Sequence, residues 1–356
     1  MADDNGVKKT STMPGNERTC PNCGGILTYD PSSRKLHCSL CGKYKEIDNR
    51  KKGNFKGVAY KDILNSNRGT PGDKAKLLSC ANCGAELIYD STQVSGTCPF
   101  CGSTNLVASA LTGSIMSPNG IIPFSIDENR AKESFYKHLN RQLLFPNVKH
   151  YVLEKLFPVY LPYISFDSDT ESEYVIEIGY RDRDSGNITY KPCSGFYKRS
   201  FSDITVLASS KTKNAQINKI RNFHPSSILP FHPGYMAGYY AERNSMTLKH
   251  AFEVAQYDMS DVLNVVIPEH AVREFKGDKY RNLEYETEYS NTNYKCILAP
   301  FYLASFSYKG KKYDVAINGE TGAVACEIPF PRKMIITILI ILGILAAAFL
   351  TFLFFR

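Results

Sequence analysis

CPNCGGILTYD, at residues 20–30, recurs as CANCGAELIYD at residues 80–90. Each copy opens a pattern in which two Cys-x2-Cys pairs are separated by 14 residues, and the second copy follows the first by 60 residues. A tetrahedral Zn²⁺ ion takes four thiolates at about 2.3 Å, and two such pairs on facing turns supply them without strain. The sequence therefore predicts two zinc ribbons, with the ligands Cys20, Cys23, Cys38, Cys41 and Cys80, Cys83, Cys98, Cys101.

Glycine follows the second cysteine of every pair, at Gly24, Gly42, Gly84 and Gly102. Without a Cβ atom the backbone can turn tightly enough for amide N–H groups to point at the sulfur atoms. Zinc that is held by four thiolates has no open coordination position, so it cannot activate water. We therefore expect two structural Zn²⁺ ions.

The C-terminal stretch from Met334 to Phe355 has 22 residues and no charged side chain. About 20 helical residues span a bilayer core of about 30 Å, so this stretch is predicted to be a transmembrane helix. Arg332 and Lys333 precede it and only Arg356 follows it, which favours a cytoplasmic N-terminal side. Residues 1–16 are polar and charged and do not form a signal peptide. The sequence thus predicts a single-pass, tail-anchored protein of the cell membrane, with its cysteines in a reducing cytosol that leaves them free for zinc.

The chain is predicted to contain six consecutive regions. They are a disordered N-terminus (1–19), the first ribbon (20–42), a basic linker (43–79), the second ribbon (80–105), an α+β domain (120–330) and the membrane helix (334–355). Two filled zinc centres lower the formal charge from +8 to about +4, which does not by itself indicate a nucleic-acid partner. The linker carries much of the positive charge. A solvated linker, contact with anionic lipid and contact with nucleic acid all remain open for it.

The domain at 120–330 is predicted to be mixed α+β with an antiparallel sheet. A helix is expected from Asp127 to Leu143, with capping-box spacing between Ser125 and Glu128, and a second helical region over 233–259. Strands are expected at 158–167, 173–181, 187–191, 284–289, 294–308, 313–317 and 323–328. The surroundings of Pro162 and Pro300 are alike, so the sequence leaves open one domain or two related halves.

The remaining chemistry-bearing residues are scattered. Cys193, Cys296 and Cys326 lie in apolar surroundings and are interpreted as small core residues. His224 and His232 each precede a proline in a proline-rich loop, without a carboxylate or cysteine at ligand spacing. No phosphate-binding loop, nucleophile elbow or metalloprotease motif occurs, so the chain is not predicted to be an enzyme.

Several motifs together resemble a known family. They are the double ribbon, Ile121-Ile122-Pro123-Phe124, Val159-Tyr160-Leu161-Pro162-Tyr163, Leu229-Pro230-Phe231 and the hairpin Asn318-Gly319-Glu320-Thr321-Gly322. The chain is similar to bacterial membrane-anchored TFIIB-type zinc ribbon-containing proteins, which are often labelled primosomal helicase-like. This resemblance implies membrane-stress systems with SPFH-type and phage-shock-like partners. A helicase activity does not fit, because no loop for ATP phosphates is present.

Two functions follow from these features. The first is an adaptor at the cytosolic face of the inner membrane, whose ribbons recruit or scaffold a protein partner. Zinc supplies the folding free energy that so small a core lacks, which leaves surface side chains free for binding. Hydrophobic residues of the ribbons either bind that partner or pack within the ribbons; they are Leu27, Tyr29, Leu87, Ile88 and Tyr89. The alternative is a nucleic-acid-binding protein that is held at the membrane, and it predicts a steep salt dependence of binding.

Overall fold

The computed structural model describes residues 18–48, 57–60, 77–88, 96–109, 118–141, 151–209, 216–308, 310–327, 340–347 and 349–351. Its fold is mixed α+β with mainly antiparallel strands, as predicted. Residues 1–17 of the predicted disordered N-terminus lie outside this range, as do most of the basic linker and Tyr89, whose exposure or packing the sequence left open.

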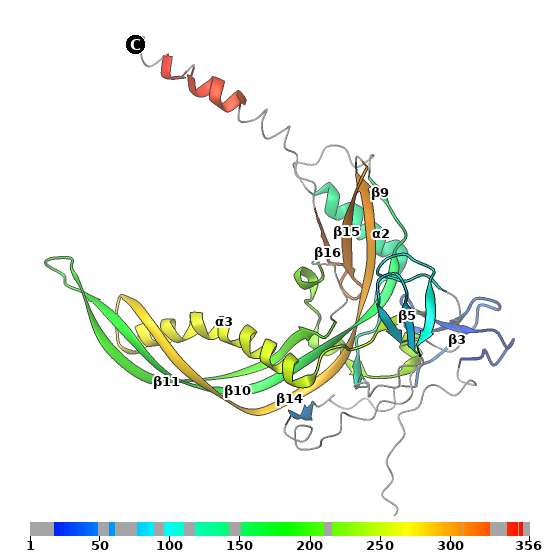
Figure 1. The fold of residues 1–356 in the computed structure, drawn as a ribbon, viewed down its shortest axis with the longest axis horizontal. Helices are drawn as coiled ribbons and strands as arrows, with labels where there is room; N and C mark the ends of the chain where they lie inside the picture. The colour runs from blue at the N-terminus through cyan, green and yellow to red at the C-terminus, as the bar shows by residue number, and fades with distance from the viewer. Residues whose placement is uncertain are drawn as a thin grey trace, which may run out of the picture.

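Two long antiparallel strands run through the centre of the molecule (Figure 1). They are β10 (Phe157–Arg181) and β14 (Lys279–Tyr308). β11 (Ile188–Leu207) pairs with β10, and β15 (Lys311–Asn318) pairs with β14. The short strands are β1 (Leu27–Asp30), β2 (Lys35–Cys38), β3 (Tyr44–Lys45), β4 (Val58–Ala59), β5 (Leu77–Cys80), β6 (Glu86–Ile88), β7 (Leu106–Ser109), β8 (Gly120–Ile121), β9 (Val152–Leu153), β12 (Leu229–Pro230), β13 (Tyr240–Glu242) and β16 (Val324–Cys326).

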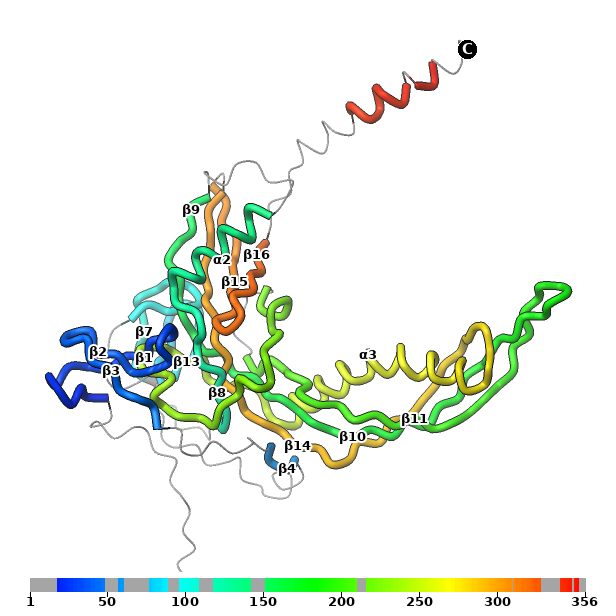
Figure 2. Tube along the Cα trace, turned by 180° about the vertical axis from the view of Figure 1, so that it is seen from behind, coloured from blue at the N-terminus to red at the C-terminus, as the bar shows by residue number. Residues whose placement is uncertain are grey.

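Each long helix covers a different part of these strands. α2 (Glu128–Asn140) buries Ala131, Phe135 and Leu139 in a core that also contains Tyr302 and the first ribbon. α3 (Leu248–Glu274) lies along an extended arm that is built from β10, β11 and β14 (Figure 2). The cores under the two helices are separate, so the molecule has two lobes joined by the long strands.

The strand register contains an internal two-fold pattern. Leu161 of β10 lies opposite Ala299 of β14, so exchanging the two strands about this pair places Pro162 on Pro300. The same exchange places Val159 of β10 on Ile297 of β14. Each of these residues pairs with a short parallel strand: Ile297 pairs with β8, and Val159 pairs with β13. Each half therefore has the order short strand, helix, long strand and hairpin partner, which is the arrangement that two related halves would produce.

The helix predictions were right in type and partly wrong in extent. α2 begins one residue after Asp127, whose carboxylate accepts the N–H of Arg130 at 2.8 Å, so Asp127 rather than Ser125 is the N-cap. The second helix starts only after Thr247. Residues 233–242 instead form a 3₁₀ turn, η5 (Pro233–Met236), followed by β13, because β13 pairs with both β10 and β6. The described chain also contains the 3₁₀ turns η3 (Ile217–Ile220) and η4 (Pro225–Ser227).

The predicted break between residues 167 and 173 does not exist, because β10 is continuous through this stretch. Its small polar residues lie in the sheet and bond to the neighbouring strand. Ser172 Oγ lies 2.8 Å from Thr287 Oγ1, and Ser168 Oγ lies 2.9 Å from Thr292 Oγ1. Buried hydroxyl groups that pair in this way are compatible with a strand interior.

The predicted transmembrane segment, 334–355, is described only in part. Residues 340–347 and 349–351 are helical, and the other residues of the segment lie outside the described range. Within the described range, no helix is both long enough and apolar enough to cross a bilayer.

Candidate metal centres

All four cysteine pairs have the same local backbone structure. The N–H of the first cysteine donates to the carbonyl five residues later, as in Cys20 to Gly25 at 2.7 Å. The N–H of the glycine after the second cysteine donates to the backbone carbonyl of the first cysteine, as in Gly24 to Cys20 at 2.9 Å. The bonds at Cys38, Cys80 and Cys98 follow the same pattern at 2.8–2.9 Å. The repeated sequence therefore folds into four copies of one turn.

Backbone conformation, not space, requires the glycine in each turn. Gly24, Gly42, Gly84 and Gly102 have φ values of 74°, 71°, 70° and 71°. A Cβ atom at Gly24, Gly42 or Gly102 would meet no heavy atom within 4 Å. These φ values lie in the left-handed region, where residues with a Cβ atom are strained.

The structure brings the predicted ligands together as two separate tetrads. In each tetrad, all four Sγ atoms lie within 4.8 Å of one another. Cys20 and Cys41 are 3.6 Å apart, and Cys23 and Cys38 are 3.5 Å apart; the corresponding distances in the second tetrad are 3.6 and 3.7 Å. A tetrahedron with Zn–S bonds of about 2.3 Å has edges of about 3.8 Å. Both tetrads therefore fit zinc, and four thiolates would fill its coordination sphere.

Hydrogen bonds make the sulfur atoms of one tetrad unequal. The N–H of Lys43 and the neighbouring thiols lower the pKa of Cys41 to about 6. The N–H of Gly25 lowers the pKa of Cys23, but hydrogen bonds with Cys41 and Cys38 outweigh it and raise that pKa to about 12. These bonds favour a thiolate at Cys41 and a protonated thiol at Cys23, and a bound cation would offset the repulsion among four thiolates.

The first ribbon packs on the body through Tyr29. This side chain is buried, and its hydroxyl donates to the carbonyl of Phe124 at 3.1 Å. Its backbone N–H donates to the carbonyl of Ala237 at 2.9 Å. Its ring contacts the ring of Tyr235 edge-on, with 5.4 Å between the ring centroids. Leu27 and Tyr29 are therefore core residues and not the exposed contacts that the sequence left open.

The second ribbon joins the large sheet. Leu87 of β6 pairs with Glu242 of β13. The equivalent residue of the first ribbon, Leu27 of β1, pairs with Cys38 of β2. β13 of the body thus takes the place beside β6 that β2 has beside β1. Glu86 and Arg243 form an ion pair at 2.9 Å next to this junction. Leu87 is fully buried and Ile88 is half-buried, so neither is an open docking residue.

Two surface residues that the sequence did not single out are Ile26 and Leu40, which are 55% and 76% exposed. Leu40 lies beside the residue before Ile26, because a Cβ atom on Gly25 would lie 2.8 Å from Leu40 Cδ1. The sequence feature that could have identified them is the difference between the two repeats at these positions. Sixty residues later, the second ribbon has the charged Glu86 and the aromatic Phe100, both of which contact the body.

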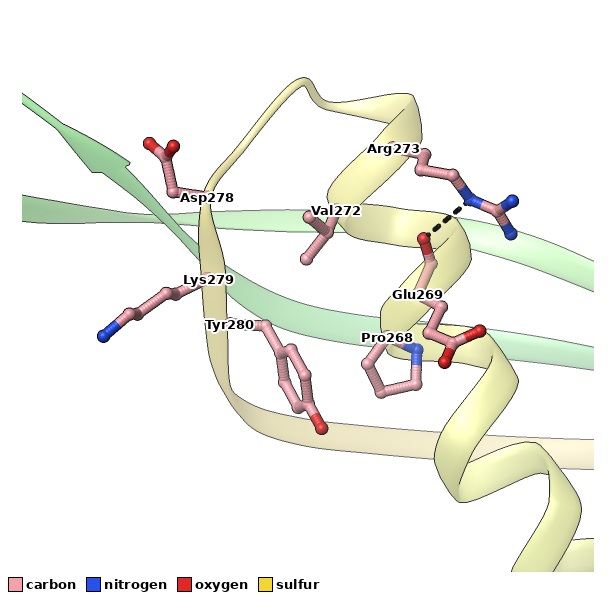
Figure 3. A pocket seen from close by; sticks show the side chains of 7 residues that line it. All are labelled: Pro268, Glu269, Val272, Arg273, Asp278, Lys279 and Tyr280. Carbon is pink, nitrogen blue, oxygen red and sulfur yellow. Dashed lines mark hydrogen bonds between the residues drawn. The ribbon is translucent and has the colours of Figure 1, made fainter.

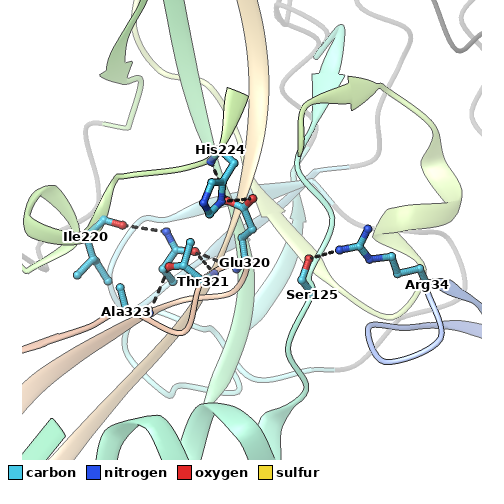
Figure 4. A network of polar contacts seen from close by, with 8 residues as sticks. Arg34, Ser125, Ile220, His224, Glu320, Thr321 and Ala323 are labelled. Carbon is cyan, nitrogen blue, oxygen red and sulfur yellow. Dashed lines mark hydrogen bonds and ion pairs between the residues drawn. The ribbon is translucent and has the colours of Figure 1, made fainter. Parts of the chain in front are cut away.

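The other singled-out residues stay outside the metal centres. Cys296 and Cys326 are buried core residues, as expected, and Cys193 is half-buried. His224 has a carboxylate neighbour that sequence spacing could not reveal: its Nδ1 lies 3.0 Å from Glu320, which is distant in sequence (Figure 4). His232 accepts the N–H of Gly234 at 3.1 Å, as a loop residue.

An open groove of 540 Å³ lies beside the C-terminal end of α3 (Figure 3). Two of its four charged side chains have partners: Asp278 accepts the N–H of Arg181 at 2.8 Å, and Arg273 donates to the carbonyl of Glu269 at 3.1 Å. The groove shares no residue with the metal centres.

The chain is similar to a protein of Bacillus subtilis (strain 168) that is described as uncharacterized protein YdjG. The two are 27% identical over 324 residues, which cover 88% of this chain and 90% of that protein. No family profile and no solved structure matches the chain. That description assigns no activity to the relative.

Proposed function

We propose that this protein is a membrane-anchored zinc-ribbon adaptor, which recruits or scaffolds a protein partner at the cytosolic face of the inner membrane. The proposal depends most on the exposed residues Ile26 and Leu40, because the first ribbon presents these two large apolar side chains to solvent. Aliphatic side chains that are held on a rigid element can serve as anchors of a protein interface.

In the second ribbon, the positions equivalent to Ile26 and Leu40 contact the body of the protein, which supports a role of these positions in protein contacts. Its residue equivalent to Leu40 is Phe100, which packs against the apolar cluster that contains Val159 and Leu161. Its residue equivalent to Ile26 is Glu86, which is paired with Arg243. The same face of the module therefore serves as a protein contact within this chain, and in the first ribbon that face is open.

The membrane anchor is part of the proposal. The 22 uncharged residues from Met334 to Phe355 have the length and composition of a single span, and the basic pair before them favours a cytosolic body. The family resemblance suggests an SPFH-type or phage-shock-like partner. Closed four-thiolate centres support binding rather than catalysis as the role of the metal.

Partner capture tests the proposal. The full chain, an Ile26→Ser/Leu40→Ser variant and a Val152→Ser/Val265→Ser variant would be purified from membranes, and the co-purifying proteins identified by quantitative mass spectrometry. Val152 and Val265 are 67% and 58% exposed and lie outside the ribbons, so this control removes comparable apolar surface. We expect the first variant to lose one defined partner and the control to keep it, while both retain two zinc ions.

Two results would contradict the adaptor. One is an identical set of proteins from all three preparations. The other is recovery that depends on nucleic acid, so that nuclease removes the partner and the purified chain shifts DNA or RNA at low salt. The second result would favour the nucleic-acid-binding alternative.

A further inference from the structure

The arm carries a second surface that is independent of the metal centres. α3 covers one face of its three strands, where Tyr174, Ile176 and Ile178 are buried. The alternate residues point to the opposite face, which we call the outer face. It consists of Glu171, Glu173, Val175 and Glu177 of β10, Glu284, Glu286 and Glu288 of β14, and Ser194, Phe196 and Lys198 of β11. Apart from the half-buried Glu177, these side chains are exposed.

Negative charges face each other directly across the two central strands. Glu171 lies opposite Glu288, and Glu173 lies opposite Glu286. Like charges at directly opposite positions destabilise a sheet. The fold gains nothing from this arrangement, because these side chains contribute to no core.

Lys198 of the outer face and the neighbouring Arg281 of β14 compensate only part of this charge. Lys198 is paired with Glu171 at 2.9 Å, and Arg281 is paired with Glu177 at 2.6 Å. In the described part of the chain, four glutamates have no ion pair; they are Glu173, Glu284, Glu286 and Glu288. The outer face would therefore repel anionic lipid and nucleic acid and attract a basic partner.

Two large apolar side chains lie among these carboxylates. Phe196 is 60% exposed and lies opposite Glu173, while Val175 is 52% exposed and lies opposite Glu284. They occupy diagonal positions on neighbouring strands, where side chains are still close enough to touch one ligand. A charged face that serves only solubility needs no exposed phenylalanine at its centre, so the pattern fits a partner with both charge and apolar surface.

We propose that the outer face of the arm docks a basic amphipathic helix of a protein partner. Three strands at about 4.8 Å spacing form a strip about 10 Å wide, and six residues extend about 20 Å along it. A helix of about 14 residues has this length and diameter. Its apolar stripe would lie on Phe196 and Val175, with Lys or Arg side chains reaching the unpaired glutamates on both sides.

Fluorescence anisotropy tests this with the full chain in detergent and a labelled 14-residue amphipathic peptide of lysine and leucine. A peptide with glutamate in place of lysine is the ligand control. We expect the basic peptide to bind and its affinity to fall with salt. Glu173→Gln/Glu286→Gln/Glu288→Gln should weaken binding about tenfold. Phe196→Ser should weaken it to a similar extent but leave the salt dependence in place.

A matched variant separates local from overall charge. Glu253→Gln/Asp261→Asn/Glu269→Gln removes three exposed charges from α3 and should leave peptide affinity within about twofold of the parent. The outer-face triple variant should also melt at a higher temperature than the parent, because it removes two like-charge pairs. Equal weakening by both triple variants, or binding that ignores Phe196→Ser, would overturn the proposed site without affecting the adaptor proposal.

Discussion

The cysteine turns show two different reasons for a glycine. At Gly42 there is free space around the position of a Cβ atom, and only the φ of 71° excludes other residues. At Gly25 the φ is ordinary, but a Cβ atom would lie 3.2 Å from the Cys38 sulfur and still closer to Leu40. The second ribbon places Ala85 at this position, so the crowding is specific to the first ribbon.

Substitutions of Gly42 should therefore report backbone strain alone. Gly42→Ala is expected to lower the free energy of unfolding by about 1–2 kcal/mol, because alanine is strained at positive φ. Gly42→Asn should cost less, since asparagine tolerates this region. Urea denaturation in excess zinc measures the difference, and metal analysis should still find two zinc ions per chain. An equal loss in both variants would argue against the φ explanation.

Tyr29 connects the first ribbon to the body through one hydroxyl group. Tyr29→Phe keeps the ring contacts but leaves the buried carbonyl of Phe124 without this donor, which should cost about 1–3 kcal/mol in the free energy of unfolding. Tyr44→Phe in the same ribbon is the control, because Tyr44 is 51% exposed. Chemical denaturation followed by near-UV circular dichroism would compare them. A comparable loss in both variants would remove the special role of Tyr29.

Tyr174 makes the stability of the arm depend on alkaline pH. Burial and the Glu274 carboxylate raise its pKa to about 12, against about 10 in the unfolded chain. Because the pKa is higher in the folded chain, the contribution of Tyr174 to the free energy of unfolding is complete below about pH 10. It is lost as pH rises to about 12. Tyr174→Phe should flatten the fall of stability across this window, measured by urea denaturation at successive pH values. An unchanged slope would contradict this assignment.

At the scale of elements, the sequence predicted what depends on local pattern. It named the eight cysteines that the structure brings together as two tetrads, because the geometry of a four-thiolate site fixes their spacing, and it placed α2 within a few residues. It missed the continuity of β10, since buried Ser168 and Ser172 look like loop residues until Thr292 and Thr287 lie beside them. The contacts of the ribbons with the body were also out of reach, because they join residues more than 90 positions apart.

One such contact can be tested at the junction of β6 and β13. Glu86→Gln removes the partner of Arg243, which is only 17% exposed, and should lower the free energy of unfolding by about 1–2 kcal/mol. Glu46→Gln breaks the exposed ion pair with Lys35 in the first ribbon and should cost less than about 0.5 kcal/mol. Thermal melts at matched zinc concentration would rank the two. Equal effects would mean that this ion pair does not stabilise the junction.

At the scale of the whole molecule, both ribbons contact the same stretch of the body. The first ribbon packs on η5 and Tyr239, and the second ribbon pairs with β13 a few residues later. The first ribbon also shares one apolar core with α2 and both long strands. The two cysteine tetrads are therefore joined to the body by direct contacts of both ribbons.

Removal of zinc should for this reason loosen the body as well as the ribbons. With a chelator and reductant present, we expect the near-UV circular dichroism of the tyrosines to fall and the melting temperature of the body to drop. The chain has 23 tyrosines and no tryptophan, so this signal reports the tyrosine-rich cores. Hydrogen exchange would separate the two ribbons. Cys23→Ala/Cys41→Ala should lower the protection of backbone amides around α2, whereas Cys83→Ala/Cys101→Ala should mainly lower protection at the β6–β13 junction. A metal-free chain with an unchanged tyrosine spectrum would mean that the ribbons fold separately from the body, and the adaptor would then present them on a flexible connection.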